Sequence, residues 1–86
     1  VRIHFMPISN APILRQTKFR VPGSWTFQDL QASLRTQLKL PSSTPLFVYC
    51  NSAFCPSPDQ ILIELFLCFG TGGELVINYS LSEAWG

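Results

Sequence analysis

The segment Ala84-Trp85-Gly86 ends the sequence in a glycine whose carboxylate has no side chain beside it. Such a carboxylate fits a narrow channel and is open to attack from most directions, which suits a protein that serves as an acyl donor. A terminal glycine also arises by accident, and chain termini are commonly frayed. The rest of the chain must therefore decide whether Gly86 has a chemical role.

The three cysteines, Cys50, Cys55 and Cys68, are the other residues with nucleophilic potential. A nucleophilic thiol needs a neighbouring base, and the single histidine, His4, is distant from all three in sequence. A small enzyme with a nucleophile at Cys50 or Cys55 is therefore disfavoured. No Cys-x-x-Cys pair occurs, so a zinc site is not expected. We expect reduced, partly buried thiols in a cytoplasmic protein without metal or cofactor, with one disulfide left as the alternative.

Composition narrows the class of protein. Eighty-six residues with an apolar fraction of 47% make one domain. The formal net charge is +1 and the six basic residues are scattered, which disfavours nucleic acid or a membrane surface as a direct partner. Glu64 interrupts the longest apolar run, which is also shorter than the ~20 residues that span a bilayer. No signal peptide is expected at the start of the sequence.

The N-terminal half predicts two strands and a helix. Residues 2–6 alternate polar and apolar side chains, which indicates a strand with one buried face. Residues 13–21 are expected to form the second strand. Thr26 with Asp29 three residues later approximates a capping box, and Pro41 closes the helix that follows. Its apolar stripe, expected to face the core, consists of Phe27, Leu30, Leu34 and Leu38.

The second strand leaves two interpretations of Phe19, which lies between Lys18 and Arg20. One is a docking patch for an acidic partner segment with an apolar anchor. The other is a core phenylalanine between two solvated charges, and the pattern alone favours it. The register of this strand is uncertain, but one side is expected to carry Ile13, Thr17, Phe19 and Val21, and the other Leu14, Gln16, Lys18 and Arg20.

The C-terminal half predicts a strand, a helix and a strand. Residues 46–50 form a short apolar strand, after which Phe54 either is exposed near Tyr49 or packs inward. Ser57 is expected to cap a helix that runs to about Phe69 and stops at Gly70, with Pro58 at its first position and Gln60 closing a capping box. The last strand spans 74–79 after a tight Thr71-Gly72-Gly73 turn. The buried face of the helix is expected to comprise Ile61, Leu62, Leu65, Cys68 and Phe69.

That second helix is apolar almost all round, because Ile63, Phe66 and Leu67 occupy its other faces. A helix of this kind is buried on more than one side. In so small a domain it indicates a contact with a partner or with a second copy.

The element order is strand, strand, helix, strand, helix, strand. This order predicts an α+β fold of the ubiquitin-like β-grasp type, with a four-stranded mixed sheet packed on one main helix plus a second, shorter helix. The folded domain is expected to span residues 1–80, followed by a C-terminal conjugation tail at 81–86.

Several segments resemble one family closely. They are Tyr49, Asn51, residues 54–60, Cys68-Phe69-Gly70 and the Ala84-Trp85-Gly86 end. Together they resemble the autophagy-related protein twelve family of ubiquitin-like modifiers, over essentially the whole folded domain. The Ser-Pro-Asp-Gln box with the Ala-Trp-Gly end is far more specific than the fold.

The resemblance implies a modifier with no catalytic residues of its own. Its terminal glycine would be adenylated and carried as a thioester by the activating enzyme, protein seven, and then by the conjugating enzyme, protein ten. It would end in an isopeptide bond to a lysine of autophagy-related protein five. That conjugate, bound to protein sixteen, would promote lipidation of a second ubiquitin-like protein during autophagosome formation. The modifier would recruit the lipidating conjugating enzyme, protein three, and would contact the phagophore membrane only indirectly.

The resemblance also assigns residues. Gly86 matches the conjugated glycine. Lys18 and Phe19 match a basic residue followed by Trp, within the surface that binds the lipidating enzyme, which reverses the preference for a plain core Phe19. Tyr49 and Phe54 match an aromatic pair that the family uses functionally.

A second group is expected to pack on protein five beside the covalent bond. It comprises Pro58, Asp59 and Gln60 with Ala84 and Trp85. The bulky Trp85 next to the reacting glycine would restrict which activating enzyme accepts the tail, and it would offer an apolar anchor on the partner.

The sequence departs from the family at a few positions. Phe19 stands where animal members have Trp, and Cys55 stands where Ala is usual. The sequence starts at the first strand, so the disordered leader common in the family is expected to be absent or trimmed. The alternative function is a non-covalent ubiquitin-like interaction module, which would not need Gly86.

Overall fold

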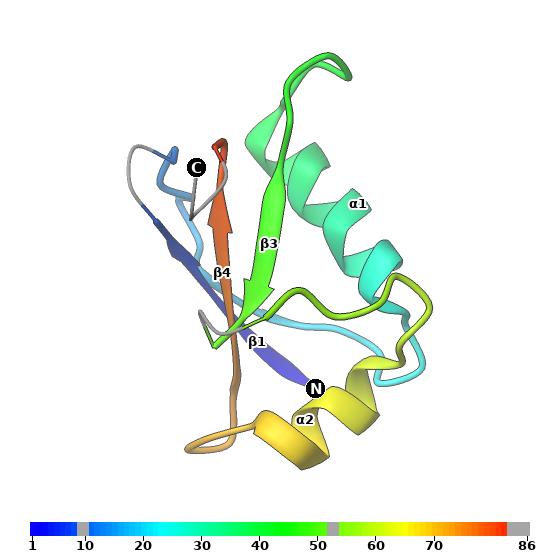
Figure 1. Ribbon diagram of the computed structural model, residues 1–86. Coiled ribbons are helices and arrows are strands. Elements are labelled where there is room, and N and C mark those ends of the chain that lie inside the picture. Colours follow the sequence, from blue (N-terminus) through cyan, green and yellow to red (C-terminus); the bar gives the residue numbers. More distant parts are fainter. Residues whose placement is uncertain (9–10, 52–53, 83–86) are drawn as a thin grey trace.

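The computed structural model describes residues 1–8, 11–51 and 54–82, which fold into one mixed sheet and two helices (Figure 1). The strand order β2-β1-β4-β3 places the first and last strands side by side as a parallel pair at the centre. Each central strand has an antiparallel neighbour at the edge of the sheet. The predicted β-grasp fold is confirmed. Its elements are β1 (Arg2–Pro7), β2 (Lys18–Arg20), α1 (Phe27–Leu38), β3 (Phe47–Cys50), α2 (Leu62–Phe69) and β4 (Leu75–Ser80).

The core lies between the sheet and α1, which covers one face of the sheet (Figure 1). Alternate residues of the central strands point to this layer, as the period of two in their sequence predicts. The predicted helical stripe meets them from the other side, although Leu38 at its end is only half-buried. The largest side chains that are fully enclosed in this layer include Ile3, Phe27, Leu30, Leu34, Leu75, Ile77 and Tyr79.

The predicted start and end of α1 are confirmed. The Thr26 hydroxyl accepts a hydrogen bond from the Asp29 backbone N–H at 3.2 Å, and the Asp29 carboxylate accepts one from the Thr26 N–H at 3.0 Å. Lys39 ends the helix with a left-handed φ of 56°, and Pro41 follows. This reciprocal capping box satisfies two of the amides that every helix start leaves without a partner.

The second strand is much shorter than predicted, because only residues 18–20 form it. The ladder to β1 continues as far as the bond from the Phe5 N–H to the Thr17 carbonyl, at 2.8 Å. The next hydrogen-bonded pair would need a donor from Pro7, which has no backbone N–H. Residues 13–16 therefore leave the sheet.

The predicted sides of that segment are also wrong. Leu14 is buried, whereas Ile13 is 79% exposed. Outside a paired strand, side chains do not have to alternate between two faces, so the segment turns Leu14 into the core by its own path.

The second helix begins later than predicted, at Leu62 rather than at Pro58. Ser57 caps no helix: its hydroxyl donates to the Asp59 carboxylate at 2.6 Å, and its carbonyl accepts from the Gln60 N–H at 3.1 Å. The segment is a separate turn because its carbonyls are used elsewhere, at the start of α1.

The burial of α2 also differs from the prediction. Only Leu62 and Leu65 are buried. Ile61, Cys68 and Phe69, which were expected on the buried face, are exposed. The helix lies at one end of the sheet (Figure 1), where a single side of it faces the core. Gly70 ends it as predicted.

A tight turn connects α2 to β4 as predicted. Gly72 and Gly73 have φ values of 60° and 80°, which glycine adopts without steric cost. An isolated bridge between Thr71 and Glu74 closes the turn. Neither helix is long and apolar enough to cross a bilayer, within the part of the chain that the structure describes.

Candidate functional site

Lys18 and Phe19 lie on the edge strand β2 and point to opposite faces of the sheet. Phe19 pairs with the buried Ile3, whereas Lys18 pairs with His4 on the solvent side. Successive strand residues face opposite sides, so one partner surface reaches both only by wrapping around the edge.

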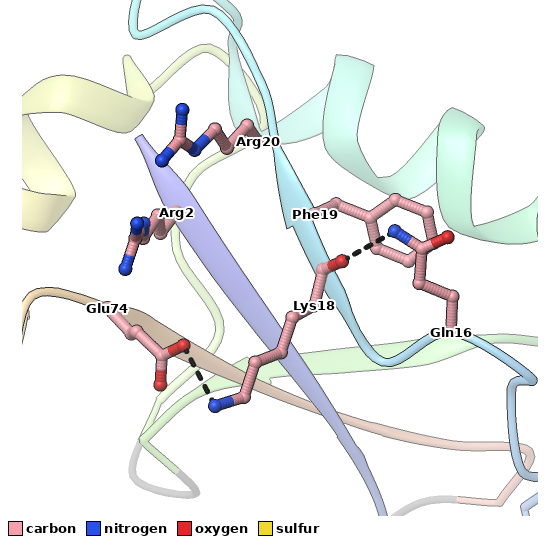
Figure 2. A pocket seen from close by; sticks show the side chains of 6 residues that line it. All are labelled: Arg2, Gln16, Lys18, Phe19, Arg20 and Glu74. Carbon is pink, nitrogen blue, oxygen red and sulfur yellow. Dashed lines mark hydrogen bonds and ion pairs between the residues drawn. The ribbon is translucent and has the colours of Figure 1, made fainter.

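The Lys18 side chain lies on the outer face, the face of the sheet turned away from α1. Its Nζ is 3.3 Å from Oε2 of Glu74, and His4 Nδ1 is 3.8 Å from the other oxygen of that carboxylate. Figure 2 shows Lys18 and Glu74 at a depression, whose volume is about 440 Å³. We call it the basic depression; it is lined by Arg2, Gln16, Lys18, Phe19, Arg20 and Glu74.

Phe19 is half-buried and packs against the core, as one interpretation of it from the sequence predicted, and the docking interpretation stays a prediction. Its ring packs edge-on against the core Phe5, with ring centroids 5.8 Å apart. The same residue lines a second depression of about 450 Å³ beside the end of α1, here called the Phe19 groove. The groove is bordered by Pro12, Ile13, Leu14, Arg15, Gln16, Phe19, Gln37, Leu38 and Lys39.

The structure does not bring Tyr49 and Phe54 to the same place as Lys18 and Phe19. Tyr49 lies on β3, at the opposite edge of the sheet from β2. Two central strands separate the edges, which at the usual spacing corresponds to about 14 Å. The four residues predicted to bind the lipidating enzyme therefore form two surfaces rather than one.

Phe54 is half-buried and packs on the second helix, so it occupies the inward one of its two predicted positions. Its ring lies 4.9 Å from that of Phe69, centroid to centroid, and its carbonyl accepts from the Cys50 N–H at 2.7 Å. Asn51 links the end of β3 to the end of α2, because its side-chain amide donates to the Phe69 carbonyl at 3.1 Å. Tyr49 pairs with Asn78 on the outer face and is half-buried there.

The turn at Pro58, Asp59 and Gln60 lies against the start of α1. The carbonyls of Pro58 and Gln60 accept hydrogen bonds from the backbone N–H groups of Gln28 and Phe27, at 2.9 and 2.8 Å. The Asp59 side chain is exposed, and the hydrogen bond from the Ser57 hydroxyl lowers the pKa of its carboxyl. The turn thus offers a fixed negative charge at the surface.

The predicted conjugation tail leaves from the centre of the sheet. β4 ends at Ser80, and the Ser82 N–H donates to the Ser80 hydroxyl oxygen at 3.1 Å. Ala84, Trp85 and Gly86 lie outside the described residues.

The cysteines differ from the predicted set of partly buried thiols. Cys55 and Cys68 are exposed and only Cys50 is buried, and all three are free thiols. Burial raises the pKa of the Cys50 thiol to about 11, so it stays protonated at neutral pH and is a poor nucleophile. Among residues 1–8, 11–51 and 54–82, no three or more His, Cys, Asp or Glu side chains are grouped so that they could hold a metal ion.

The sequence did not predict the basic depression. Arg2 is far from Lys18 and Arg20 along the chain, and these charges looked scattered. The antiparallel register of β1 and β2 brings them together. An exact strand pairing would have been needed to find the cluster.

Comparisons with known proteins agree with the predicted resemblance. The family model described as ubiquitin-like autophagy protein Apg12 matches residues 1–86. The chain is 45% identical over 84 residues to the ubiquitin-like protein atg12 of Dictyostelium discoideum, covering 98% of this chain and 68% of that protein. It is 46% identical over 86 residues to ATG12 of Medicago truncatula, covering 100% and 87% of the two chains.

More distant relatives extend this likeness. The chain is 42% identical over 79 residues to ATG12 of Mus musculus, covering 92% of this chain and 56% of that protein. The crystal structure of Trypanosoma brucei ATG8 superposes with a TM-score of 0.84 at 25% identity, over 93% of this chain and 71% of that one. The chain therefore belongs to the family of ubiquitin-like autophagy proteins Apg12.

Proposed function

We propose that this chain is a protein modifier that is joined through the carboxylate of Gly86 to a lysine of autophagy-related protein five. The observation that carries the proposal is the family match, which extends over residues 1–86 and so includes the predicted conjugation tail. The central position of β4 also supports it, because the tail leaves from a strand that is paired on both sides.

The proposed chemistry is acyl transfer performed by other proteins. Adenylation by the activating enzyme makes the Gly86 carbonyl carbon electrophilic. A cysteine thiolate of the activating enzyme attacks it and adenylate leaves, and a second thiolate on the conjugating enzyme takes over the acyl group. The lysine amine of protein five then attacks the thioester, loses a proton and releases the thiolate. This chain contributes the acyl group and the surfaces by which the enzymes hold it.

We further propose two docking surfaces for the lipidating enzyme, protein three. The first is the edge of β2, with Lys18 in the basic depression and Phe19 in the Phe19 groove. The second is the opposite edge, with Tyr49 and Phe54. A partner that uses both must contact two separate edges of the sheet, which a folded enzyme with an extended segment can do.

The turn at Pro58, Asp59 and Gln60, together with Ala84 and Trp85, is proposed to pack on protein five beside the covalent bond. The first turn of α1 holds the backbone of this turn, so it presents a preformed surface. Bound to protein sixteen, the conjugate would promote lipidation of a second ubiquitin-like protein. The protein would act in the cytoplasm and, as part of the conjugate, at the phagophore.

A reconstitution tests this proposal. The chain ending at Gly86 is incubated with ATP, the activating and conjugating enzymes and protein five, beside a form that lacks Gly86. A covalent adduct is expected only with the intact chain. If both forms give the same non-covalent complex and no adduct, the chain acts as an interaction module instead.

A further inference from the structure

The outer face of β1 and β2 carries two rungs of basic side chains that face each other. The antiparallel register pairs Arg2 with Arg20 in one rung and His4 with Lys18 in the next. All four side chains lie on the same face because they are two residues apart along each strand. Like charges placed directly opposite each other destabilise a sheet.

Backbone hydrogen bonds show that the two arginines are held close. Val1 and Val21 exchange both hydrogen bonds, at 2.9 and 3.0 Å. Their neighbours, Arg2 and Arg20, are therefore a non-hydrogen-bonded pair, the type whose side chains lie closer together. The two guanidinium groups project from adjacent strands on one side of the sheet, as Figure 2 shows.

The two rungs differ in how their charge is compensated. In the His4–Lys18 rung, the Glu74 carboxylate lies 3.3 Å from the Lys18 ammonium and 3.8 Å from the His4 ring nitrogen. Among the described residues, no carboxylate forms an ion pair with Arg2 or Arg20, which make up the other rung. Glu74 is thus the carboxylate that lines the depression, together with three cationic side chains, Arg2, Lys18 and Arg20. The lining therefore retains two uncompensated positive charges.

We propose that Arg2 and Arg20 together bind a phosphoryl group carried by a phosphorylated segment of a partner protein. A phosphate monoester carries a charge of about −1.5 to −2 at pH 7, which matches the excess charge. Two planar guanidinium forks suit its oxygens better than single ammonium groups do. The depression of about 440 Å³ has room for the group.

An extended peptide fits this position because β2 is an edge strand. The N–H and C=O groups of Phe19 and Val21 are directed to β1, so those of Lys18 and Arg20 face outward. The Gln16 side chain donates to the Lys18 carbonyl at 2.9 Å, which leaves Arg20 as the open part of the edge. A segment paired there would place a side chain beside Arg20 on the outer face. A flat anionic membrane would also meet the Glu74 carboxylate, which disfavours it.

This inference adds a ligand class at the basic depression that is also proposed, through Lys18, to dock protein three, and it does not depend on Gly86. Its test uses the isolated chain and a named probe, a short valine–threonine peptide with one central phosphoserine. Chemical shifts of the Arg2 and Arg20 amides are followed by NMR during titration. The phosphopeptide is expected to bind saturably, and the versions with serine or glutamate at the same position at least tenfold more weakly. Equal binding of the glutamate peptide would overturn the proposal.

Variants locate the site. Arg2→Gln and Arg20→Gln are each expected to weaken phosphopeptide binding about tenfold or more. Arg15→Gln removes the same charge outside the basic depression and is expected to leave binding within about twofold. An equal loss in all three would show a diffuse charge effect and no site. Stronger arginine-dependent binding to phosphatidylserine vesicles than to the phosphopeptide would identify a membrane site and also overturn the proposal.

A stability measurement shows whether the arginine pair is structural. Because the two charges repel in the free protein, Arg20→Gln is expected to melt at the same temperature as the unsubstituted chain or higher at low salt. A lower melting temperature for Arg20→Gln, with none for Arg15→Gln, would mean that the pair stabilises the fold, and would contradict a site built from uncompensated charge.

Discussion

Thr26 and Ile61 pair across an isolated antiparallel bridge that joins the starts of the two helices. On one side of it, the Phe27 N–H donates to the Gln60 carbonyl at 2.8 Å. On the other, the Leu62 N–H donates to the Trp25 carbonyl at 2.8 Å. Each helix thus begins on the backbone of the segment that precedes the other, which explains why α2 needs no side-chain cap.

Replacing Thr26 by Ala should destabilise the protein by about 1 kcal/mol, because it removes the hydroxyl that accepts from the Asp29 N–H. Urea denaturation measures the change. Thr36→Ala is the matched control on the same helix: it is exposed, its hydroxyl bonds only the Ala32 carbonyl behind it, and it should cost less than about 0.5 kcal/mol. Equal losses would mean that the cap contributes nothing specific.

Two leucines of α2 should respond very differently to truncation. Leu65 is fully buried and Leu67 is 75% exposed. Leu65→Ala should reduce the free energy of unfolding by about 2–5 kcal/mol, and Leu67→Ala by less than about 0.5 kcal/mol. A large loss at Leu67 in the monomer would show that this face is covered within the chain. A loss that is present at high protein concentration and disappears on dilution would show a contact between copies.

Two of the three cysteine thiols should react with an alkylating reagent, and the third should be protected from it. In the native protein at neutral pH, iodoacetamide should modify Cys55 and Cys68 but not Cys50, which is buried. Mass spectrometry of labelled peptides measures this, and labelling of Cys50 at the rate of the other two would contradict the structure.

The same thiol predicts a loss of stability in alkali. Between pH 9.0 and about 11 the Cys50 thiol ionises in the unfolded chain but stays protonated in the folded one. The unfolded state then binds fewer protons, so the free energy of unfolding falls as pH rises through this range. Cys50→Ala should flatten that slope, which urea denaturation at a series of pH values measures.

Patterns in the sequence were reliable where one local rule acted alone. The period of two in β1, the stripe of α1 and the Thr26–Asp29 box each depend on a few neighbouring residues. The predicted start of α2 was wrong because Ser57-Pro58-Asp59-Gln60 satisfies the local rule for a helix start, yet its carbonyls cap α1 instead. That contact joins segments about thirty residues apart, which no local pattern reports.

The candidate site shows the same limit. Lys18 and Tyr49 were predicted from a resemblance, which gives residues but not their distance across the sheet. The arginine pair depends on the register of β1 and β2. Pro7 helps to end the pairing of these strands because it has no backbone N–H to donate. The short strand β2 therefore could not be separated from its flanking segment by alternation alone.

Lys18→Asp should weaken binding of the lipidating enzyme while leaving conjugation to protein five intact. The change reverses a charge that is 62% exposed and places it beside Glu74, on the edge proposed for docking. Its fold should persist, because an exposed ion pair contributes only about 0–1 kcal/mol. Lys39→Asp makes the same charge change in the lining of the Phe19 groove, so weaker binding there as well would extend the docking surface along that groove. Loss of both activities with an unfolded circular dichroism spectrum would make Lys18 structural.

The most direct test of the modifier function is to map the bond formed in the reconstituted reaction. The chain contains no Lys or Arg after Lys39, but Glu83 directly precedes Ala84-Trp85-Gly86. A protease that cleaves after glutamate should therefore leave the branch Ala84-Trp85-Gly86 on one lysine of protein five, and mass spectrometry should detect it. Finding that branch supports acyl transfer through Gly86. An adduct joined through any other residue, or no adduct while the two proteins still bind, would contradict it.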